Sequence, residues 1–559
     1  MDNYVIAKSF SLLSKLMDIH GENSFKSKTY SIAAYKIEQL TVDLQTLSKE
    51  QIFSINGIGD AIGKKIIQLL DKGKMEELDD LISKTPEGII EMMKIKGIGP
   101  KKIFIIWKEM EIENIGELLY ACHENRLALM KGFGKKTQQN VIESIEFYQQ
   151  QQGNYLYAQV VQLASDVEAL LKKLFGSDNV KTTGAFLRQA ETLDELEFVV
   201  ALPEKNVIDN ISSKEEFEFI ENTPAYILYK YNRLIKIKLF ASEEETFLQK
   251  SFETSGSKEF IDAFYHHLKV SESSVKLAKT DTEIFKKAGL QYVPSFLREN
   301  KDIIAIAKQH KIPDVIKPGD IKGIIHCHSN WSDGSNTLEE LATACVKKGF
   351  EYLVISDHSK SAYYAKGLNE DQIKAQHNLI DELNDKLKPF KIFKSIESDI
   401  LNDGSLDYSD AILSTFDLVI TSIHSNLKMN EEKAMNRLLN AIENPFTTIL
   451  GHMTGRLLLT RKGYPVDHIK IIDACAANNV VIEINAHPKR LDMRWQWLEY
   501  ALSKNVLISI DPDSHSIEEF DNTKYGVLVA QKGMLTSKDN LSSFSLPELE
   551  NFLKTRKKK

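Results

Sequence analysis

From residue 320 to residue 510, short apolar runs alternate with helical patterns. The runs are rich in residues that favour strands, and they occupy residues 323–327, 352–356, 391–396, 417–423, 447–450 and 506–510. Apolar positions at helical spacing occur between them, at residues 338–348, 370–387 and 431–442. Alternating strands and helices predict a parallel sheet, and closure of such a sheet gives a barrel.

Side chains that can bind a metal ion follow these runs. The set comprises His326, His328, Asp333, Asp357, His358, Glu397, Asp399, His424, His452, Asp511, Asp513 and His515. His326 and His328 are two residues apart in a strand, so we expect them to project together, with Cys327 on the other face. Active sites of α/β barrels lie at the carboxyl ends of the strands, and imidazoles with carboxylates suit borderline metals. The alternative, unrelated caps and core groups, requires the same placement to arise repeatedly by chance.

The first 150 residues have apolar positions at a spacing of about 3.6, which indicates helices almost throughout. Within them a Gly-x-Gly motif recurs, followed each time by two lysines. The copies are Gly57/Gly59 with Lys64 and Lys65, Gly97/Gly99 with Lys101 and Lys102, and Gly132/Gly134 with Lys135 and Lys136. Glycines allow a tight turn whose amides can contact phosphate, and lysines add attraction to DNA. These motifs resemble helix-hairpin-helix motifs, which bind DNA without reading its sequence; a purely structural array of hairpins is the alternative.

Residues 153–315 contain strands with charged side chains on one face. Glu195 and Glu197 alternate along a strand at 195–200 and form a candidate magnesium pair, and a second alternating strand at 233–240 contains Lys236 and Lys238. A Gly-Ser pair, Gly256 and Ser257, follows.

Length and composition set further bounds. A chain of 559 residues predicts three or four domains. Its net charge of −8 means that contacts with DNA must be local. The four cysteines form no Cys-x-x-Cys pair, which favours a reducing compartment. No apolar run approaches the ~18 residues of a membrane span and the beginning of the chain lacks a signal peptide's apolar core, so we expect a cytoplasmic protein.

On its metal-binding residues, the region 320–559 resembles a polymerase-and-histidinol-phosphatase (PHP) domain. The resemblance implies a distorted seven-stranded (β/α) barrel that binds three metals and hydrolyses phosphoesters. It assigns the first metal to His326, His328, Glu397 and Asp513, the second to a bridging Glu397 with His424 and His452, and the third to Asp333, His358 and His515. Such histidine-rich ligation suits zinc, manganese or iron.

Catalysis at this site is assigned to Glu397 and Asp513, with Arg456 and Arg490 as clamps for phosphate oxygens. For each arginine a structural ion pair is an equal alternative. His487 matches no ligand of the family and is interpreted as a surface histidine.

Residues 1–152 resemble the helix-hairpin-helix region of family X DNA polymerases, including their small amino-terminal domain. In some members that domain cleaves abasic sugar phosphates through a Schiff-base lysine, whose position Lys65 matches. A lysine that follows a hairpin more commonly contacts phosphate, and that role is favoured for Lys65.

Residues 153–315 resemble the palm and thumb of the same family, with losses at the residues that carry chemistry. Where the family has three aspartates, this chain has Glu195, Glu197 and Lys236. The family's Gly-Ser turn is Gly184-Ala185 and its first arginine is Leu187, although Arg188 remains. Magnesium needs near-ideal octahedral ligation, and an ammonium removes a ligand while repelling the cation. Magnesium binding and DNA synthesis at this palm are therefore disfavoured.

The sequence predicts a multidomain protein. It comprises an all-α helix-hairpin-helix region at 1–152, an α+β nucleotidyltransferase-like palm and thumb at 153–315, and an α/β distorted (β/α)7 barrel at 320–559. The expected function is DNA repair by a metal-dependent 3′-5′ exonuclease or 3′-end-processing phosphoesterase, a monomer acting on gapped, nicked or 3′ ends without sequence specificity. The alternatives are a polymerase with residual gap-filling activity and a phosphatase of small metabolites.

Overall fold

The computed structural model describes all residues except 151–152, 269–277 and 558–559. The chain divides into two compact units, Met1–Tyr148 and Gln149–Lys559. Among the described residues, no helix is both long enough and apolar enough to cross a membrane.

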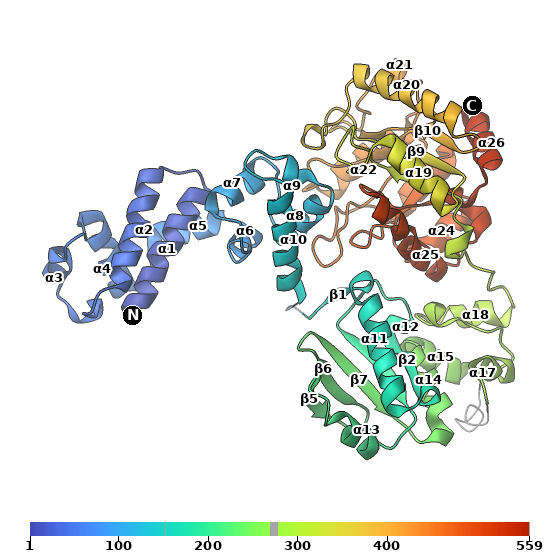
Figure 1. Ribbon diagram of the computed structural model, residues 1–559, viewed down its shortest axis with the longest axis horizontal. Coiled ribbons are helices and arrows are strands. Elements are labelled where there is room, and N and C mark those ends of the chain that lie inside the picture. The colour runs from blue at the N-terminus through green and yellow to red at the C-terminus, as the bar shows by residue number, and fades with distance from the viewer. Residues whose placement is uncertain (151–152, 269–277, 558–559) are drawn as a thin grey trace. The chain divides into compact units, whose positions relative to one another are not determined.

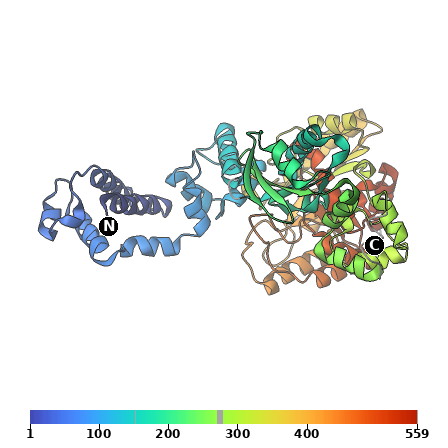
Figure 2. The same ribbon diagram turned by 90° about the horizontal axis from the view of Figure 1, so that it is seen from below.

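The first unit is built from helices (Figures 1 and 2). They are α1 (Asn3–Ile19), α2 (Ser24–Glu38), α3 (Lys49–Ser54), α4 (Asp60–Lys72), α5 (Glu76–Lys84), α6 (Glu87–Met92), α7 (Pro100–Lys108), α8 (Ile115–His123), α9 (Arg126–Leu129) and α10 (Lys135–Gln150). Their buried faces form one apolar core, to which the long helix α1 contributes Phe10, Leu13 and Met17. This is the all-helical arrangement that the apolar spacing predicts.

The three Gly-x-Gly motifs form turns of one geometry. The first glycines, Gly57, Gly97 and Gly132, have φ values of +90°, +92° and +89°, a left-handed conformation that L-residues with a side chain rarely adopt. Helices α4, α7 and α10 begin directly after the second glycine of each motif. Ile58 and Ile98, between the glycines, are buried in the core, so these turns are held in place from inside the unit.

The second glycine of each motif does not share the left-handed conformation. Gly59 and Gly99 have φ values of −78° and −89°, and Gly134 is likewise outside the positive-φ region. At Gly59, Gly99 and Gly134 an added Cβ would meet no atom of the described residues within 4 Å. Only the first glycine of each motif therefore needs the conformational freedom of glycine, because a negative φ is open to residues with a side chain.

The palm-like part of the second unit contains a five-stranded sheet in the order β2-β4-β7-β6-β5. Strands β4 and β7 are parallel, and the other neighbours are antiparallel. Helix α11 packs Val160, Val167 and Leu171 into the core that this sheet shares. The elements are β1 (Tyr155–Leu156), α11 (Tyr157–Phe175), β2 (Val180–Thr183), α12 (Gly184–Leu187), β3 (Thr192–Leu193), β4 (Glu195–Val200), α13 (Glu204–Ile211), β5 (Phe217–Asn222), β6 (Ile227–Tyr231) and β7 (Ile235–Ala241), then α14 (Phe247–Ser255), α15 (Lys258–Leu268), α17 (Asp281–Lys287) and α18 (Ile303–Lys308).

Parallel strands alternate with helices in the remainder of the second unit, and Figure 1 shows the helices grouped around the strands. The strands are β8 (Gly323–Cys327), β9 (Tyr352–Ile355), β10 (Lys391–Lys394), β11 (Glu397–Asp399), β12 (Ile420–Ser422), β13 (Ile449–Leu450), β14 (Val481–Asn485) and β15 (Ile508–Asp511). The helices are α19 (Leu338–Lys348), α20 (Glu370–Lys386), α21 (Asp410–Leu413), α22 (Glu431–Glu443), α23 (His468–Asn478), α24 (Leu498–Ser503), α25 (Thr523–Lys532) and α26 (Leu546–Lys557).

Backbone pairing closes these strands into a distorted barrel. They form a three-stranded sheet, β10-β9-β8, and a five-stranded sheet, β11-β12-β13-β14-β15. Strands β10 and β11 are two parts of one interrupted strand, since Ser395 and Glu397 continue the hydrogen bonding alongside β9. Bridges between His358 and Glu397 and between Cys327 and Ser514 join the two sheets at both seams. The fully described region 320–557 thus contains seven strands around the barrel, the number that the resemblance to the PHP domain implies; the apolar runs alone did not include β14.

The hairpin geometry predicts unequal effects of alanine at the two glycines of one turn. An added Cβ meets no described atom within 4 Å at either Gly97 or Gly99, but only Gly97 has a positive φ. Gly97→Ala should therefore destabilise this hairpin by about 1–2 kcal/mol through backbone strain alone. Hydrogen exchange of the α7 amides in the full chain should become about 5–30-fold faster.

Gly99→Ala is the matched control and should leave this exchange nearly unchanged. Equal acceleration in the two variants would contradict the strain argument.

Candidate metal centre

The centre begins at the carboxyl end of β8, where the strand is irregular. The register with β9 shifts between Ile324 and Cys327, and His326 has a φ of +59°. Both His326 and His328 are fully buried. Their Nε2 atoms lie 3.4 Å and 3.2 Å from Oδ1 of Asp513. The two imidazoles share one acid as expected, although a bulge as well as strand alternation sets their direction.

Glu397, on β11, lies at the middle of the centre. Its Oε1 is 3.3 Å from Nε2 of His326, 3.2 Å from Nε2 of His424 and 3.0 Å from Nε2 of His452. Its Oε2 is 3.0 Å from Nδ1 of His358 and 3.6 Å from Nε2 of His328. Its side chain is 1% exposed. The two oxygens face different imidazoles, which is the placement that a bridging ligand needs.

A third group surrounds Asp333, in the loop after β8. One oxygen of Asp333 lies 3.5 Å from Nε2 of His515 and the other lies 3.5 Å from Nε2 of His358. The structure therefore brings together all nine side chains that the resemblance to the PHP domain nominates. Donor atoms lie within 4.8 Å of one another in three overlapping sets: His328, Asp333, His358 and His515; His326, His328 and Asp513; and His358, Glu397 and His424.

Hydrogen bonding tests whether these residues fit metal ions. Nε2 of His326, Nδ1 of His328 and Oε2 of Glu397 are buried atoms for which the described residues supply no hydrogen-bond partner. Buried polar atoms are normally paired, and an unpaired one costs free energy. Divalent cations would satisfy these atoms, and the mixed nitrogen and oxygen donors suit zinc, manganese or iron. The donor set therefore fits divalent metals.

Electrostatics agree with this fit. Burial opposes ionisation of Glu397, but His424, His326 and His358 lower its pKa well below the usual range. Burial likewise opposes ionisation of Asp333, and His358 and His515 lower its pKa well below normal. The neighbouring imidazoles therefore favour the ionised form of both carboxylates, the form that binds a cation.

A second layer of carboxylates orients the imidazoles. Oε1 of Glu483 lies 2.5 Å from Nδ1 of His326, and Oδ1 of Asp399 lies 2.5 Å from Nδ1 of His424. Glu483 also accepts a 2.6 Å hydrogen bond from the backbone N–H of His452. Such partners fix the ring orientation and raise the basicity of metal-binding histidines. The sequence marked Asp399 only as a side chain that can bind a metal and did not predict that Asp399 or Glu483 orients an imidazole; both lie in strands of the barrel.

The two proposed phosphate clamps have different surroundings. Arg490 is buried and its Nε lies 3.8 Å from Oδ2 of Asp513, beside the metal-binding residues. Arg456 donates from Nη1 and Nη2 to the two oxygens of Glu191, at 3.1 Å and 2.7 Å. That is the structural ion pair considered as the alternative for Arg456. His487 is 7% exposed, so the interpretation as a surface histidine is wrong; the fold of its loop, which sequence alone does not reveal, buries it.

The palm-like site differs from a two-metal site in its charges. Glu195 and Glu197 lie on β4, in register with Lys236 and Lys238 on the parallel strand β7. The ammonium of Lys238 pairs directly with Glu195, whereas that of Lys236 lies 3.9 Å from Asp194. Sequence reasoning missed this role of Lys238. Alternation along the strand places Lys238 on the same face as Lys236. Only the alignment of β7 with β4 shows that Lys238 lies close enough to Glu195 to pair with it.

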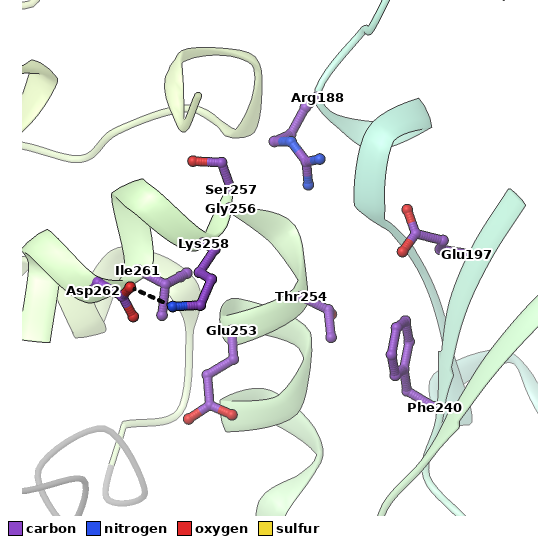
Figure 3. Close-up of a pocket in the computed structure, with 10 residues that line it drawn as sticks. All are labelled: Arg188, Glu197, Phe240, Glu253, Thr254, Gly256, Ser257, Lys258, Ile261 and Asp262. Carbon is purple, nitrogen blue, oxygen red and sulfur yellow. Dashed lines mark hydrogen bonds and ion pairs between the residues drawn. The ribbon is translucent and has the colours of Figure 1, made fainter. Parts of the chain in front are cut away.

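Glu197 is held by the backbone. It accepts a 2.8 Å hydrogen bond from the N–H of Ala185, and burial raises its pKa. Gly184, with a φ of +69°, lets the turn approach Glu197 closely, since an added Cβ would lie 1.6 Å from Oε2. Beside it is a cavity of about 360 Å³ lined by Arg188, Glu197, Glu253, Ser257, Lys258 and Asp262, among others (Figure 3). The cationic Lys258 is paired with Asp262 at 3.0 Å in this cavity (Figure 3).

The hairpin glycines nominated for DNA contact are not equally accessible. Gly134 is half-buried, so it is less open to a phosphate than its counterparts Gly59 and Gly99, because the fold of the third hairpin partly covers it. The exposed members of the set are Gly57, Gly59, Gly97, Gly99 and Gly132. The role of all six glycines in binding DNA stays a prediction.

In the first unit, Lys65 lies in a small charged cluster. Its Nζ is 2.5 Å from Glu77, which is also 2.5 Å from Nζ of Lys26. The ring of Tyr30 lies 5.6 Å from the Lys65 ammonium. Both lysines therefore have a carboxylate partner, and the roles of Lys65 in phosphate contact or lyase chemistry stay predictions.

Comparisons with known proteins match the three regions. Residues 1–75 match a helix-hairpin-helix domain, residues 89–146 a SAM-like helix-hairpin-helix tandem, and residues 325–487 a PHP domain. The chain is 31% identical to the DNA polymerase/3′-5′ exonuclease PolX of Bacillus subtilis over 98% of this chain and 99% of that protein. It is 24% identical to a probable phosphatase of Thermoanaerobacter sp. over 42% of this chain and 95% of that protein. The helix-hairpin-helix region, the PHP domain and the mixed multidomain fold expected from the sequence are confirmed.

The carboxylates of Asp399 and Glu483 can be tested by measuring metal binding, without an assay of catalysis. Asp399→Asn and Glu483→Gln each remove the carboxylate that orients one metal-facing imidazole. Each change should lower affinity for Mn²⁺ at one site by about 10–100-fold, measured by equilibrium dialysis of the full chain.

Asp385→Asn serves as the control, because Asp385 is an exposed carboxylate paired with Lys388 at 2.9 Å on the same barrel. Unchanged Mn²⁺ affinity in both Asp399→Asn and Glu483→Gln would show that these carboxylates do not orient the metal-facing imidazoles.

Proposed function

The chain belongs to the family of the Bacillus subtilis DNA polymerase/3′-5′ exonuclease PolX, and from that starting point we propose that it acts in DNA repair mainly as a metal-dependent 3′-5′ exonuclease. The observation that supports this best is the buried Glu397, with histidine nitrogens at both carboxylate oxygens. A donor set of this kind suits phosphoester hydrolysis. In this proposal the palm-like domain no longer synthesises DNA.

The residues of the centre have separate roles in this reaction. The nine histidine and carboxylate side chains would hold up to three divalent metals, which lower the pKa of bound water and neutralise charge on a phosphoryl group. Arg490 is placed beside Asp513, where its guanidinium can hold a phosphate oxygen. Glu483 and Asp399 keep His326 and His424 in their metal-facing orientations.

The substrate class follows from the helix-hairpin-helix region. Its three turns present backbone amides and nearby lysines, a combination that suits the phosphate backbone of DNA and not a particular base sequence. We propose gapped or nicked DNA and free 3′ ends as substrates, and a monomer as the acting form.

Loss of synthesis is supported by the ion pair between Lys238 and Glu195. The ammonium lies against a carboxylate that would otherwise be available to magnesium, and magnesium tolerates few departures from octahedral oxygen ligation. Two observations favour other functions: the name of the Bacillus subtilis relative includes polymerase activity, and the relatives that match the barrel region are described as probable phosphatases.

The proposed nuclease activity is tested on 5′-labelled gapped DNA with Mn²⁺. The wild-type chain should shorten the labelled strand from its 3′ end. The double variant His326→Ala/His328→Ala removes two of the buried nitrogens and should slow shortening by more than about 100-fold, because even partners of metal ligands contribute 10–100-fold.

His266→Ala, at an exposed histidine of α15, should shorten DNA at the wild-type rate. Intact DNA together with rapid release of phosphate from small monoesters would instead favour the phosphatase.

The state of the palm is tested separately by adding nucleotides to the same DNA. No template-directed extension should occur with Mg²⁺ or Mn²⁺, since Lys238 neutralises Glu195. The Bacillus subtilis relative is the positive control. Extension that disappears in the variant Glu195→Gln/Glu197→Gln would show that the palm still synthesises DNA.

A further inference from the structure

A buried arginine connects the palm-like domain to the metal centre. Arg456 follows the metal-facing His452 by four residues, and its side chain is 2% exposed. Both terminal nitrogens donate to Glu191, one to each carboxylate oxygen. Glu191 immediately precedes β3 of the palm-like domain, and its carbonyl accepts a 3.0 Å hydrogen bond from the N–H of Tyr157. The palm therefore supplies a fixed carboxylate to a barrel loop.

The same guanidinium also binds the next barrel loop, since Nη2 of Arg456 donates to the carbonyl oxygen of Leu491. Asp492, the following residue, accepts hydrogen bonds of 2.9 Å and 2.8 Å from the backbone N–H and hydroxyl of Thr454. The loops after β13 and β14 are thus tied to each other and to Glu191 through one cation.

Both loops lead directly to the metal-facing side chains. The carbonyl of His452 accepts a 2.9 Å hydrogen bond from the N–H of Gly455. The carbonyl of Asp492 accepts a 2.5 Å hydrogen bond from the N–H of Asn485, whose side chain donates to Asp513 at 2.9 Å. A change at Glu191 therefore reaches His452 and Asp513 through a short series of hydrogen bonds.

We propose that Glu191 is a positioning residue of the metal centre: through Arg456 it sets the place of the His452 loop, so that the palm-like domain serves the phosphoesterase as a structural component. The inference rests on the proposed function for its catalytic consequence, but not for its effect on metal binding. A second contact supports it. Lys532 of the barrel helix α25 is buried and donates to Glu299 at 2.6 Å and to the carbonyl of Arg188 at 2.7 Å, both in the palm-and-thumb region.

The test compares Glu191→Gln, which removes the charge at constant size, with Glu191→Asp, which keeps the charge. Glu168→Gln is the matched control, because Glu168 is a palm carboxylate paired with Lys172 inside helix α11 at 2.8 Å. Mn²⁺ binding to the full chain is measured by equilibrium dialysis, and hydrolysis is measured on bis(p-nitrophenyl) phosphate, a diester too small to need the DNA-binding hairpins. Circular dichroism and thermal unfolding monitor the fold.

Glu191→Gln should weaken the weakest Mn²⁺ site about tenfold and lower kcat on the small diester about tenfold, with KM little changed. Glu191→Asp should recover part of both losses, and Glu168→Gln should match the wild type. If Glu191→Gln fails to fold, Glu191→Asp and Arg456→Lys decide the question by the same Mn²⁺ measurement.

Unchanged Mn²⁺ affinity and unchanged diester hydrolysis in Glu191→Gln would overturn the inference, even if cleavage of DNA fell, because Glu191 would then act on DNA alone. A wild-type chain that binds Mn²⁺ but hydrolyses neither substrate would refute the proposed function. The shift in Mn²⁺ affinity would still decide the role of Glu191.

Discussion

The structure of the barrel depends on burying the carboxylate of Glu397. This side chain is 1% exposed, and an isolated carboxylate in such a place is strongly unfavourable. Imidazoles from several strand ends approach both its oxygens and favour its ionised form. Such groups can meet only where strands converge, at one rim of a closed parallel sheet. The need to surround one buried charge therefore explains why the ligands are far apart in the sequence and close in space.

The sequence predicted the barrel and the positions of candidate donors because the relevant signals are local, and the resemblance to the PHP domain selected nine of them. Each donor lies beside a short apolar run, and the rim where parallel strands end follows from topology alone. Details that depend on register were not predictable. Alternation brought His326 and His328 together, but the shift between Ile324 and Cys327 shows that a bulge takes part. The pairing of Lys238 with Glu195 likewise requires the alignment of β4 with β7.

In the hairpins, too, the local sequence revealed where each turn lies but not the backbone conformation of its two glycines. A repeated Gly-x-Gly was enough to locate each turn, but the spacing could not tell which glycine the backbone requires. Only the first of each pair has a positive φ, and Gly134 is partly covered where Gly59 is open. The two glycines of a motif therefore have different physical reasons to be present.

Contacts between distant segments were beyond sequence reasoning for a different reason. Arg456 and Glu191 are 265 residues apart, and nothing in either neighbourhood identifies the partner. For Arg456 the sequence indicated a phosphate clamp or a structural ion pair equally well. Burial of His487 is similar, since a polar residue in a loop is usually exposed and only the folded loop covers it.

The contacts of Arg456 and Lys532 join the palm-like domain to the barrel independently of any chemistry at the palm. Glu195, Glu197 and Lys236 instead lie on the palm's own strands β4 and β7. Removing only one of the carboxylates, Glu191 or Glu299, would leave Arg456 or Lys532 without its charged partner, and both cations are 2% exposed. Breaking a buried ion pair by removing one partner costs about 3–5 kcal/mol, a large part of the stability of a typical domain. The contacts that the palm-like domain makes with the barrel therefore do not depend on DNA synthesis at the palm.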